Sequence, residues 1–376
     1  MKFLRILFFL LLTTNENLYS QGSPPWENPL LTCISYDGIN FSPPVIFQDS
    51  SGVPCIIRWK GDTLICAFQW FRGPLGSPTW DRVAVKFSYD DGQHWTAPVP
   101  IAINNFPPSF QRPFDPALVR FANDSLRIYF SSSDGVSAGL DSLVNTYSAV
   151  STDGIHYTFE AGARADHPAS RLIDPSVIYF NHSWHYLSPS GAPQDGAFHF
   201  ISPDGLQFNQ VQDIHSDSLH NWTGNYLVVD SSEMRFYGCG ENGIWFNTTP
   251  NGGVWTGYTA SNIRGGDPSV VQLLNNSFQI VFTGGTGPTF VTETGGESEY
   301  FKIYPNPAVT DFCITNAGSK EYLSGYQLFD CTGQFIEKGI FYGETRVSTA
   351  NLENGFYIIA LNTGESVHFH SLIIFK

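Results

Sequence analysis

Paired apolar runs separated by two polar residues recur along most of the chain. Polar pairs such as Lys60-Gly61 and Asn275-Asn276 separate each first run from a second one. This pattern predicts a β-hairpin that is repeated five times. The first strand of each hairpin is nearly all apolar, which is typical of an inner strand buried on both faces. The five predicted first strands are Val53–Trp59, Asp115–Phe121, Asp174–Phe180, Thr223–Val229 and Asp267–Leu273.

A second motif follows four of these hairpins and also precedes the first one. It has a Ser or Thr, then Asp-Gly (Asn-Gly in the last copy), and then an aromatic residue. Asp and Gly favour a tight turn, the hydroxyl group ties the backbone, and the aromatic ring packs between neighbouring sheets. The copies are Ser35–Phe41, Ser88–Trp95, Ser151–Tyr157, Ser202–Phe208 and Thr249–Trp255. The motif resembles the Asp-box of sialidases and related β-propellers.

The number of hairpins predicts a closed ring. Five inner hairpins need five outer ones; four follow in order, and the fifth comes from residues 30–47. The final blade then combines strands from both ends of the domain, which removes exposed sheet edges. We therefore predict an all-β fold with a five-bladed β-propeller over residues 24–285, closed by its N-terminal strands.

The C-terminal region predicts a second, smaller domain. Residues 286–299 are rich in Gly, Thr and Glu and are predicted to be a linker, and alternating strands over 300–376 predict a small antiparallel β-sandwich. The motifs Tyr304–Pro307, Asp330–Gly333 and Leu352–Tyr357 resemble those of the sorting domain of the type IX secretion system of the Bacteroidota. This resemblance implies interaction with that secretion machinery, passage through the outer membrane, and then release or surface attachment. An accessory carbohydrate-binding sandwich is the alternative.

The N-terminus and the charge balance also indicate export. A basic start followed by the apolar run Ile6–Leu12 predicts a signal peptide over residues 1–21. No later segment is long and apolar enough for a membrane helix. The formal net charge of −15 argues against binding to nucleic acid or to an anionic membrane surface, because both need clustered Lys and Arg.

Six cysteines are too few for a disulfide scaffold. If Lys60-Gly61 is a two-residue turn, Cys55 lies opposite Cys66, so this pair predicts either a disulfide or two buried free thiols. The chain has no CxxC or HExxH motif or other spaced Cys/His cluster, and we expect neither a metal site nor a cofactor.

The topology of a propeller sorts the carboxylates into two groups. The Asp-box turns lie between the third and fourth strands, on the face opposite the ligand funnel, so their aspartates are expected to be structural. Asp115, Asp174 and Asp267 open inner strands and are expected to converge at the funnel. Glu241, in a loop on the same face, is a further candidate acid, with a solvated turn residue as the alternative.

Arginine and tryptophan residues on the same face are candidate substrate ligands. Arg112, Arg171 and Arg264 each lie three residues before an Asp-Pro pair, which predicts a ring of guanidinium groups around a polar substrate. The alternative is that each arginine merely neutralises its aspartate. Loop residues that we expect to contact a sugar are Trp80, Arg82 and Trp222, and Asp81 lies among them.

Aspartates that open the inner strands of a five-bladed ring resemble the clan of arabinanases, xylosidases and invertases. That resemblance implies two carboxylates acting as acid and base across a glycosidic bond and a third that tunes a pKa. The chain departs from the clan at Val53, where an Asp is usual, and no blade begins with Glu. The sequence thus predicts a secreted glycoside hydrolase-like propeller acting on, or binding, polysaccharide. The alternatives are a non-catalytic carbohydrate- or surface-binding propeller and a sialidase-like exo-glycosidase.

Overall fold

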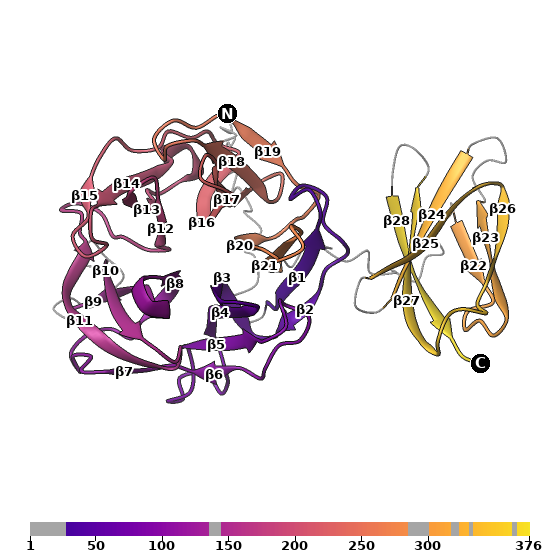
Figure 1. Ribbon diagram of the computed structural model, residues 1–376, viewed down its shortest axis with the longest axis horizontal. Helices are drawn as coiled ribbons and strands as arrows, with labels where there is room; N and C mark the ends of the chain where they lie inside the picture. Colours follow the sequence, from indigo (N-terminus) through magenta and orange to yellow (C-terminus); the bar gives the residue numbers. More distant parts are fainter. Residues whose placement is uncertain (1–27, 135–143, 285–300, 317–322, 331–333, 363–366) are drawn as a thin grey trace, which may run out of the picture.

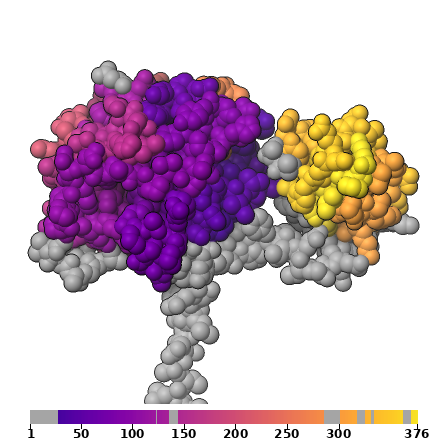
Figure 2. All heavy atoms as spheres, turned by 90° about the horizontal axis from the view of Figure 1, so that it is seen from below, coloured from indigo at the N-terminus to yellow at the C-terminus, as the bar shows by residue number. Residues whose placement is uncertain are grey.

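The computed structural model describes residues 28–134, 144–284, 301–316, 323–330, 334–362 and 367–376. The predicted signal peptide and linker therefore lie outside the described residues. Residues 30–283 and 301–376 form two separate all-β bodies (Figure 1, Figure 2). Within the described part of the chain, no helix is long and apolar enough to cross a membrane.

The larger body consists of five sheets whose first strands lie nearest a common centre (Figure 1). From this centre outward, the first sheet contains β3 (Ser51–Lys60), β4 (Thr63–Trp70), β5 (Arg82–Ser88) and β6 (Val99–Pro100). The second contains β8 (Phe114–Arg120), β9 (Leu126–Ser133), β10 (Val144–Ser151), β11 (His156–Ala165) and β7 (Ala102–Asn104). The third contains β12 (Ser176–Phe180), β13 (Ser183–Pro189), β14 (Ala197–Ser202) and β15 (Asn209–Gln210). The fourth contains β16 (His220–Val228), β17 (Met234–Gly240), β18 (Trp245–Thr249) and β19 (Tyr258–Ala260).

The fifth sheet combines strands from both ends of this body. Its two inner strands are β20 (Gly266–Gln272) and β21 (Phe278–Thr283), and its outer strands are β1 (Leu30–Ser35) and β2 (Val45–Gln48). β1 pairs antiparallel with β21 over its whole length. The first two strands of each sheet are antiparallel neighbours, and the N-terminal strands pair into the fifth sheet.

Apolar side chains fill the space between each sheet and the next. The fifth sheet also packs on the first, through Val281 and Phe47 on one side and Ile56 and Phe68 on the other. The other four interfaces are represented by Trp59 with Phe130, Val119 with Trp184, Leu187 with Trp222, and Leu227 with Ile280. Each sheet thus buries both faces, which explains the continuous apolar runs of the inner strands.

Of the two alternatives for Cys55 and Cys66, the structure shows the buried free thiols and not the disulfide. A register shift between Arg58 and Lys60 places Ile56, not Cys55, opposite Cys66. Neighbouring positions on a strand point to opposite faces, so the two sulfur atoms do not meet. Both thiols are free, and burial raises the pKa of Cys55 to about 11. Three further cysteines are also free, namely Cys33, Cys239 and Cys313, whereas Cys331 lies outside the described residues.

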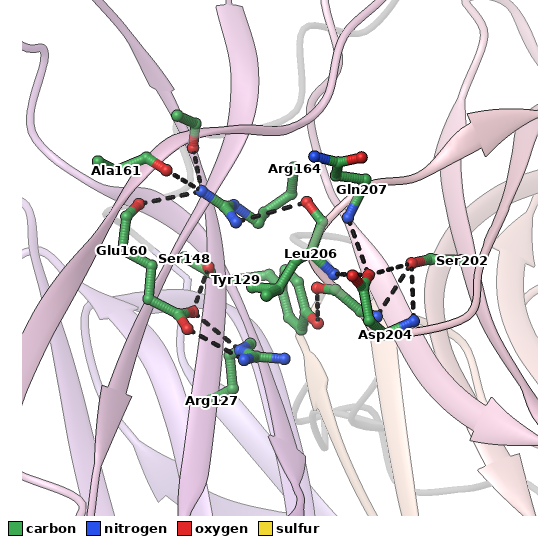
Figure 3. Close-up of polar contacts among 12 residues, drawn as sticks. Arg127, Tyr129, Ser148, Glu160, Ala161, Arg164, Ser202, Asp204, Leu206 and Gln207 are labelled. Atoms are coloured by element: carbon green, nitrogen blue, oxygen red, sulfur yellow. Dashed lines mark hydrogen bonds and ion pairs between the residues drawn. The ribbon is translucent and has the colours of Figure 1, made fainter.

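The Ser-x-Asp-Gly turns have the local hydrogen bonds expected for them. In the third sheet, Ser202 Oγ donates to Asp204 Oδ1 (2.9 Å) and accepts from Gly205 N (2.9 Å). Gly205 has φ of 72°, a conformation that costs little without a Cβ. Tyr129 of the second sheet donates its hydroxyl proton to Gly205 O (2.7 Å), so the turn also joins two sheets (Figure 3).

A buried ion pair lies beside this contact in the second sheet. Arg127 donates to both carboxylate oxygens of Glu160 (2.8 and 3.0 Å), and Ser148 Oγ donates to the same carboxylate (2.6 Å) (Figure 3). The Arg127 side chain is 7% exposed and that of Glu160 is 21% exposed. Arg164, whose guanidinium donates to main-chain oxygens including that of Ala161, adds a second positive charge nearby (Figure 3).

The C-terminal body is the expected β-sandwich. One sheet contains β22 (Phe301–Tyr304), β23 (Asp311–Asn316) and β26 (Glu344–Ser348); the other contains β25 (Phe335–Tyr342), β24 (Leu323–Asp330), β27 (Gly355–Asn362) and β28 (Val367–Ile374). Phe312, Leu328 and Leu372 are in its core. Asn306 of the Tyr-Pro-Asn-Pro motif donates to Ser371 O (2.8 Å) and thereby ties the motif to β28.

Replacing Glu160 by Gln is expected to lower the free energy of unfolding by ~2–3 kcal/mol, because the buried Arg127 charge then lacks its counter-charge. This cost lies below that of a fully buried pair because Glu160 is partly exposed. Urea unfolding monitored by tryptophan fluorescence measures it. The control is Arg120→Gln, which breaks the exposed Arg120–Asp124 pair and is expected to cost under ~1 kcal/mol. Equal costs for the two variants would contradict the prediction.

Candidate active site

The inner strands share one unusual backbone feature at their centre-facing start. Val53, Asp115, Asp174 and Asp267 have φ of 49°, 49°, 50° and 47°, and each directly precedes a proline. The strands β3, β8 and β20 have a register shift at this point. Because proline has no N–H, it cannot continue the ladder, and a bulge forms that redirects the preceding side chain. The fourth sheet has a shift at the same place, with Gly224 at φ of 151°.

This bulge brings three aspartates together from three sheets. We call Asp115, Asp174 and Asp267 the hub acids. Asp174 N donates to Asp115 Oδ2 (3.2 Å), which links the second and third sheets directly. Thr283 Oγ1 donates to Asp267 Oδ2 (3.3 Å) in the fifth sheet. Asp115 is 8% exposed, whereas Asp174 and Asp267 are partly exposed.

Burial and mutual repulsion make the hub acids weak acids. Burial, together with the negative charges of Asp267 and Asp81, raises the pKa of Asp115 to about 7. Burial and the charges of Asp115 and Asp267 raise the pKa of Asp174 well above its usual value, against the opposing charge of Arg171. Burial also raises the pKa of Asp267. Each of these shifts favours the protonated form of a hub acid relative to an isolated aspartate.

The Asp-box aspartates have the opposite environment. Asp90, at the other end of the first sheet, accepts hydrogen bonds from Ser88 Oγ and from the main chain and ring of His94. Slight burial opposes the effect, but these donors lower the pKa of Asp90 to about 2. Such a group is a stable anion within its turn, in agreement with the structural role predicted for it.

The predicted arginine ring is exposed, and its members differ in their contacts. Arg112 donates to Asp81 Oδ2 (2.8 Å) and to Trp80 O (2.8 Å), and so reaches the first sheet. Arg171 acts on Asp174 through its charge. Arg264 is exposed before β20, and the structure shows no bond between it and Asp267.

The remaining predicted residues fall into different surroundings. Trp80 is partly exposed and lies against Phe71, with ring centroids 5.6 Å apart. Glu241 is exposed in the turn between β17 and β18, with no contact to the hub acids among the described interactions. Trp222 is 1% exposed, so it is not available as a sugar platform. It packs against Phe236 and Trp245 because β16 begins at His220 and carries Trp222 into the core.

Gln69 is a site residue that the sequence reasoning missed. Its Oε1 accepts from Asp115 N (3.2 Å), and its Nε2 donates to Asp81 Oδ1. It thus joins a hub acid to the loop that carries Asp81. The sequence signal that could have identified it is a single amide side chain at the end of the apolar run Leu64–Phe68 of strand β4. No group of three or more His, Cys, Asp or Glu residues in the described ranges is arranged to hold a metal ion.

Comparison with known protein families finds a match to the C-terminal body. Residues 302–375 match the secretion system C-terminal sorting domain. This match indicates export, with a secreted or cell-surface location. No curated protein is similar enough to the chain to identify a relative.

Solved structures that resemble the chain are distant. A Hadza microbial sialidase is 12% identical with a TM-score of 0.42; the match covers 64% of this chain and 56% of the sialidase. A Bombyx mori β-fructofuranosidase is 12% identical with a TM-score of 0.47, covering 94% and 90%. An exo-β-1,3-galactanase from Phanerochaete chrysosporium is 11% identical with a TM-score of 0.46, covering 87% and 95%.

Replacing Asp115 by Asn is expected to stabilise the protein at high pH. The pKa of Asp115 is about 7 in the folded state and ~3.9 in the unfolded chain, so between these values only the folded state keeps the proton. Wild-type stability therefore falls as pH rises through this window. The variant lacks this loss, and we expect it to be more stable by about 2–4 kcal/mol at pH 8, with little difference at pH 4.

Urea unfolding at pH 4, 6 and 8 measures this effect. Asp90→Asn is the matched control, because the lowered pKa of Asp90 gives the opposite sign: its removal destabilises the protein at neutral pH. An Asp115→Asn variant that is destabilised equally at every pH would show that this carboxyl group is not held protonated.

Proposed function

We propose that residues 30–283 form a closed five-bladed β-propeller with the hub acids at the mouth of its channel. The support is the pairing of β1 with β21 and the apolar packing of the fifth sheet on the first. In such a ring the starts of all inner strands face one side. That arrangement agrees with the contribution of Asp267 to the raised pKa of Asp115, although the two residues are 152 positions apart in a chain of 376 residues.

The function that this site supports best is the hydrolysis of a glycosidic bond. The observation that carries the proposal is the convergence of three carboxyl groups, with raised pKa values, at the common centre of the sheets. Glycoside hydrolysis needs one carboxyl group that holds a proton for the leaving oxygen and one carboxylate that acts as base or nucleophile. A cluster that shares protons at neutral pH meets this need.

We assign a role to each hub acid from the exposure of its side chain and the direction of its pKa shift. Asp174 is partly exposed, and burial together with the charges of Asp115 and Asp267 raises its pKa, so we assign it the role of proton donor. Asp267 is also accessible, and the hydrogen bond from Thr283 favours its ionised form, so it is the base or nucleophile. Asp115 is buried and accepts the main-chain N–H of Asp174, so it positions Asp174 and adjusts its pKa. Glu241 remains the alternative proton donor from a loop.

The location of the protein limits the range of possible substrates. The sorting domain indicates export, so the substrate is a polysaccharide or glycan outside the cell. In this proposal the signal peptide starts export, the C-terminal sorting domain engages the type IX machinery, and Trp80, Arg82, Arg112, Arg171 and Arg264 border the substrate.

A non-catalytic glycan-binding propeller is the second candidate function. Val53 favours it, because this residue has the same φ as the hub acids and supplies no carboxyl group from the first sheet. A sialidase-like exo-glycosidase is a third possibility that would use Arg112, Arg171 and Arg264. Arg112 already binds Asp81, which leaves it less free to bind a substrate carboxylate.

Asp174→Asn and Asp267→Asn are each expected to reduce kcat on the hydrolysed glycan at least ~100-fold, because each removes a group that transfers a proton or stabilises charge. Reducing-sugar release from a panel of neutral and acidic polysaccharides measures the reaction. Asp62→Asn, an exposed turn residue at the far end of the first sheet, is the control and should retain activity. Equal loss with Glu241→Gln alone would reassign the proton donor. Glycan binding without turnover by the wild type would identify a binding module instead.

A further inference from the structure

A pocket of about 260 Å³ lies between the first and second sheets, beside the loop that carries Asp81. Two arginines, Arg82 at the start of β5 and Arg112 before β8, border it, and its walls are mainly apolar. We call it the arginine pocket. Apolar residues that line it include Ile101, Phe106, Pro107 and Phe110.

The arginine pocket has more positive than negative charge. Asp81 is the counter-ion of Arg112, and its other carboxylate oxygen accepts from Gln69. Arg82 reaches only the main-chain oxygen of Asp81 (3.5 Å) among the described residues. Two guanidinium groups therefore share one carboxylate whose oxygens are both engaged. The chain as a whole has a formal net charge of −15, so this local excess of positive charge is opposite in sign to the net charge of the molecule.

The two guanidinium groups repel each other, which an anion between them would relieve. Partial burial and the neighbouring charge of Arg112 lower the pKa of Arg82, against the opposing charge of Asp81. Guanidinium groups bind carboxylate and sulfate oxygens through paired hydrogen bonds, and partial burial strengthens such bonds. The polar end of the arginine pocket is thus complementary to an anionic group.

The apolar walls fit the body of a sugar ring. Phe106 and Phe110 meet edge to face with centroids 5.7 Å apart, and both are only partly buried. Aromatic and proline faces pack on the C–H face of a sugar, while the polar end binds its charged substituent. The volume is below the ~300–1,000 Å³ of pockets that enclose drug-sized ligands, so it suits a single ring.

A chain of hydrogen bonds connects the arginine pocket to the hub acids. Arg112 binds Asp81, Asp81 binds Gln69, and Gln69 accepts the N–H of Asp115. The negative charge of Asp81 also contributes to the raised pKa of Asp115. The arginine pocket is thus linked to a hub acid through side chains of the first and second sheets.

We propose that the arginine pocket is an anion-binding subsite and that the substrate is an acidic glycan bearing a carboxylate or sulfate ester. This inference rests on the proposed glycan function of the hub acids. Arg82 is its specificity-determining residue, because, of the two guanidinium groups in the pocket, Arg112 forms the ion pair with Asp81, whereas Arg82 contacts only the main-chain oxygen of Asp81 among the described residues.

Isothermal titration with Asp174→Asn protein, which we expect to bind without turnover, tests the inference. The probes are oligogalacturonate, its carboxyl-reduced neutral counterpart, and a sulfated galactan oligosaccharide with its desulfated counterpart. We expect at least one acidic probe to bind ~10-fold or more tightly than its neutral counterpart. Comparing the two pairs distinguishes carboxylate from sulfate recognition. Preference for neither acidic probe would overturn the inference.

Two arginine variants then show which residue produces the preference for the acidic probe. Arg82→Gln in the same background should bind the acidic and neutral members of a pair within ~2-fold, whereas Arg120→Gln, at the opposite end of β8, should keep the preference. In protein with all arginines intact, added inorganic sulfate should weaken binding of the acidic probe only. If the preference for the acidic probe remains both in Arg82→Gln and in the presence of sulfate, the anionic group binds elsewhere and the inference is overturned.

The failure of this inference and that of the hydrolase proposal are distinguishable. Wild-type protein that hydrolyses only neutral glycans retains the hydrolase function and refutes the anion subsite. Wild-type protein that binds acidic oligosaccharides through Arg82 without cleaving them supports the subsite and refutes the hydrolase.

Discussion

The site depends on one backbone constraint: the bend that a left-handed residue before proline introduces at the start of an inner strand. An ordinary strand would alternate its side chains between the two faces of the sheet, into the apolar layers on either side. The left-handed residue, which forms a bulge in β8 and β20, instead turns Asp115, Asp174 and Asp267 away from this alternation. Backbone strain of ~1–3 kcal/mol at each such position persists only where the surroundings enforce it. The apolar packing of each sheet on its neighbours supplies that enforcement.

The same residue type has opposite chemistry at the two ends of the sheets. Asp90 and Asp204 accept several hydrogen bonds from N–H and O–H donors in their turns, and these bonds lower the pKa of each carboxyl. The hub acids have few donors, are buried and repel one another, and their pKa values are raised. The outer turns therefore stabilise the fold, whereas the hub stores unfavourable interactions that a bound substrate or proton can relieve.

The repeated elements of the fold could be predicted from the sequence because they depend on local patterns. Apolar runs with polar turns gave the hairpins, and the counting of hairpins gave the role of the N-terminal strands. Features that depend on a single bulge could not be predicted. The shift between Arg58 and Lys60 separates Cys55 from Cys66, and the early start of β16 buries Trp222. Gln69 belongs to no motif, and only the folded chain brings its amide to Asp115 and Asp81.

Val53 shows that the backbone bend belongs to the fold, whereas the carboxyl group at the bend belongs to the site. A β-branched residue is a poor choice at a φ of 49°, yet β3 keeps the bend there. The bend is thus a property of the repeated architecture, and the side chain at each bend decides the chemistry. With no carboxyl group from the first sheet, negative charge is concentrated toward the second, third and fifth sheets. The edge between the first and second sheets instead presents Arg82 and Arg112. In the proposed function, a glycan that spans this boundary meets the hub acids on one side and guanidinium groups on the other, and this asymmetry gives an acidic chain its direction across the hub.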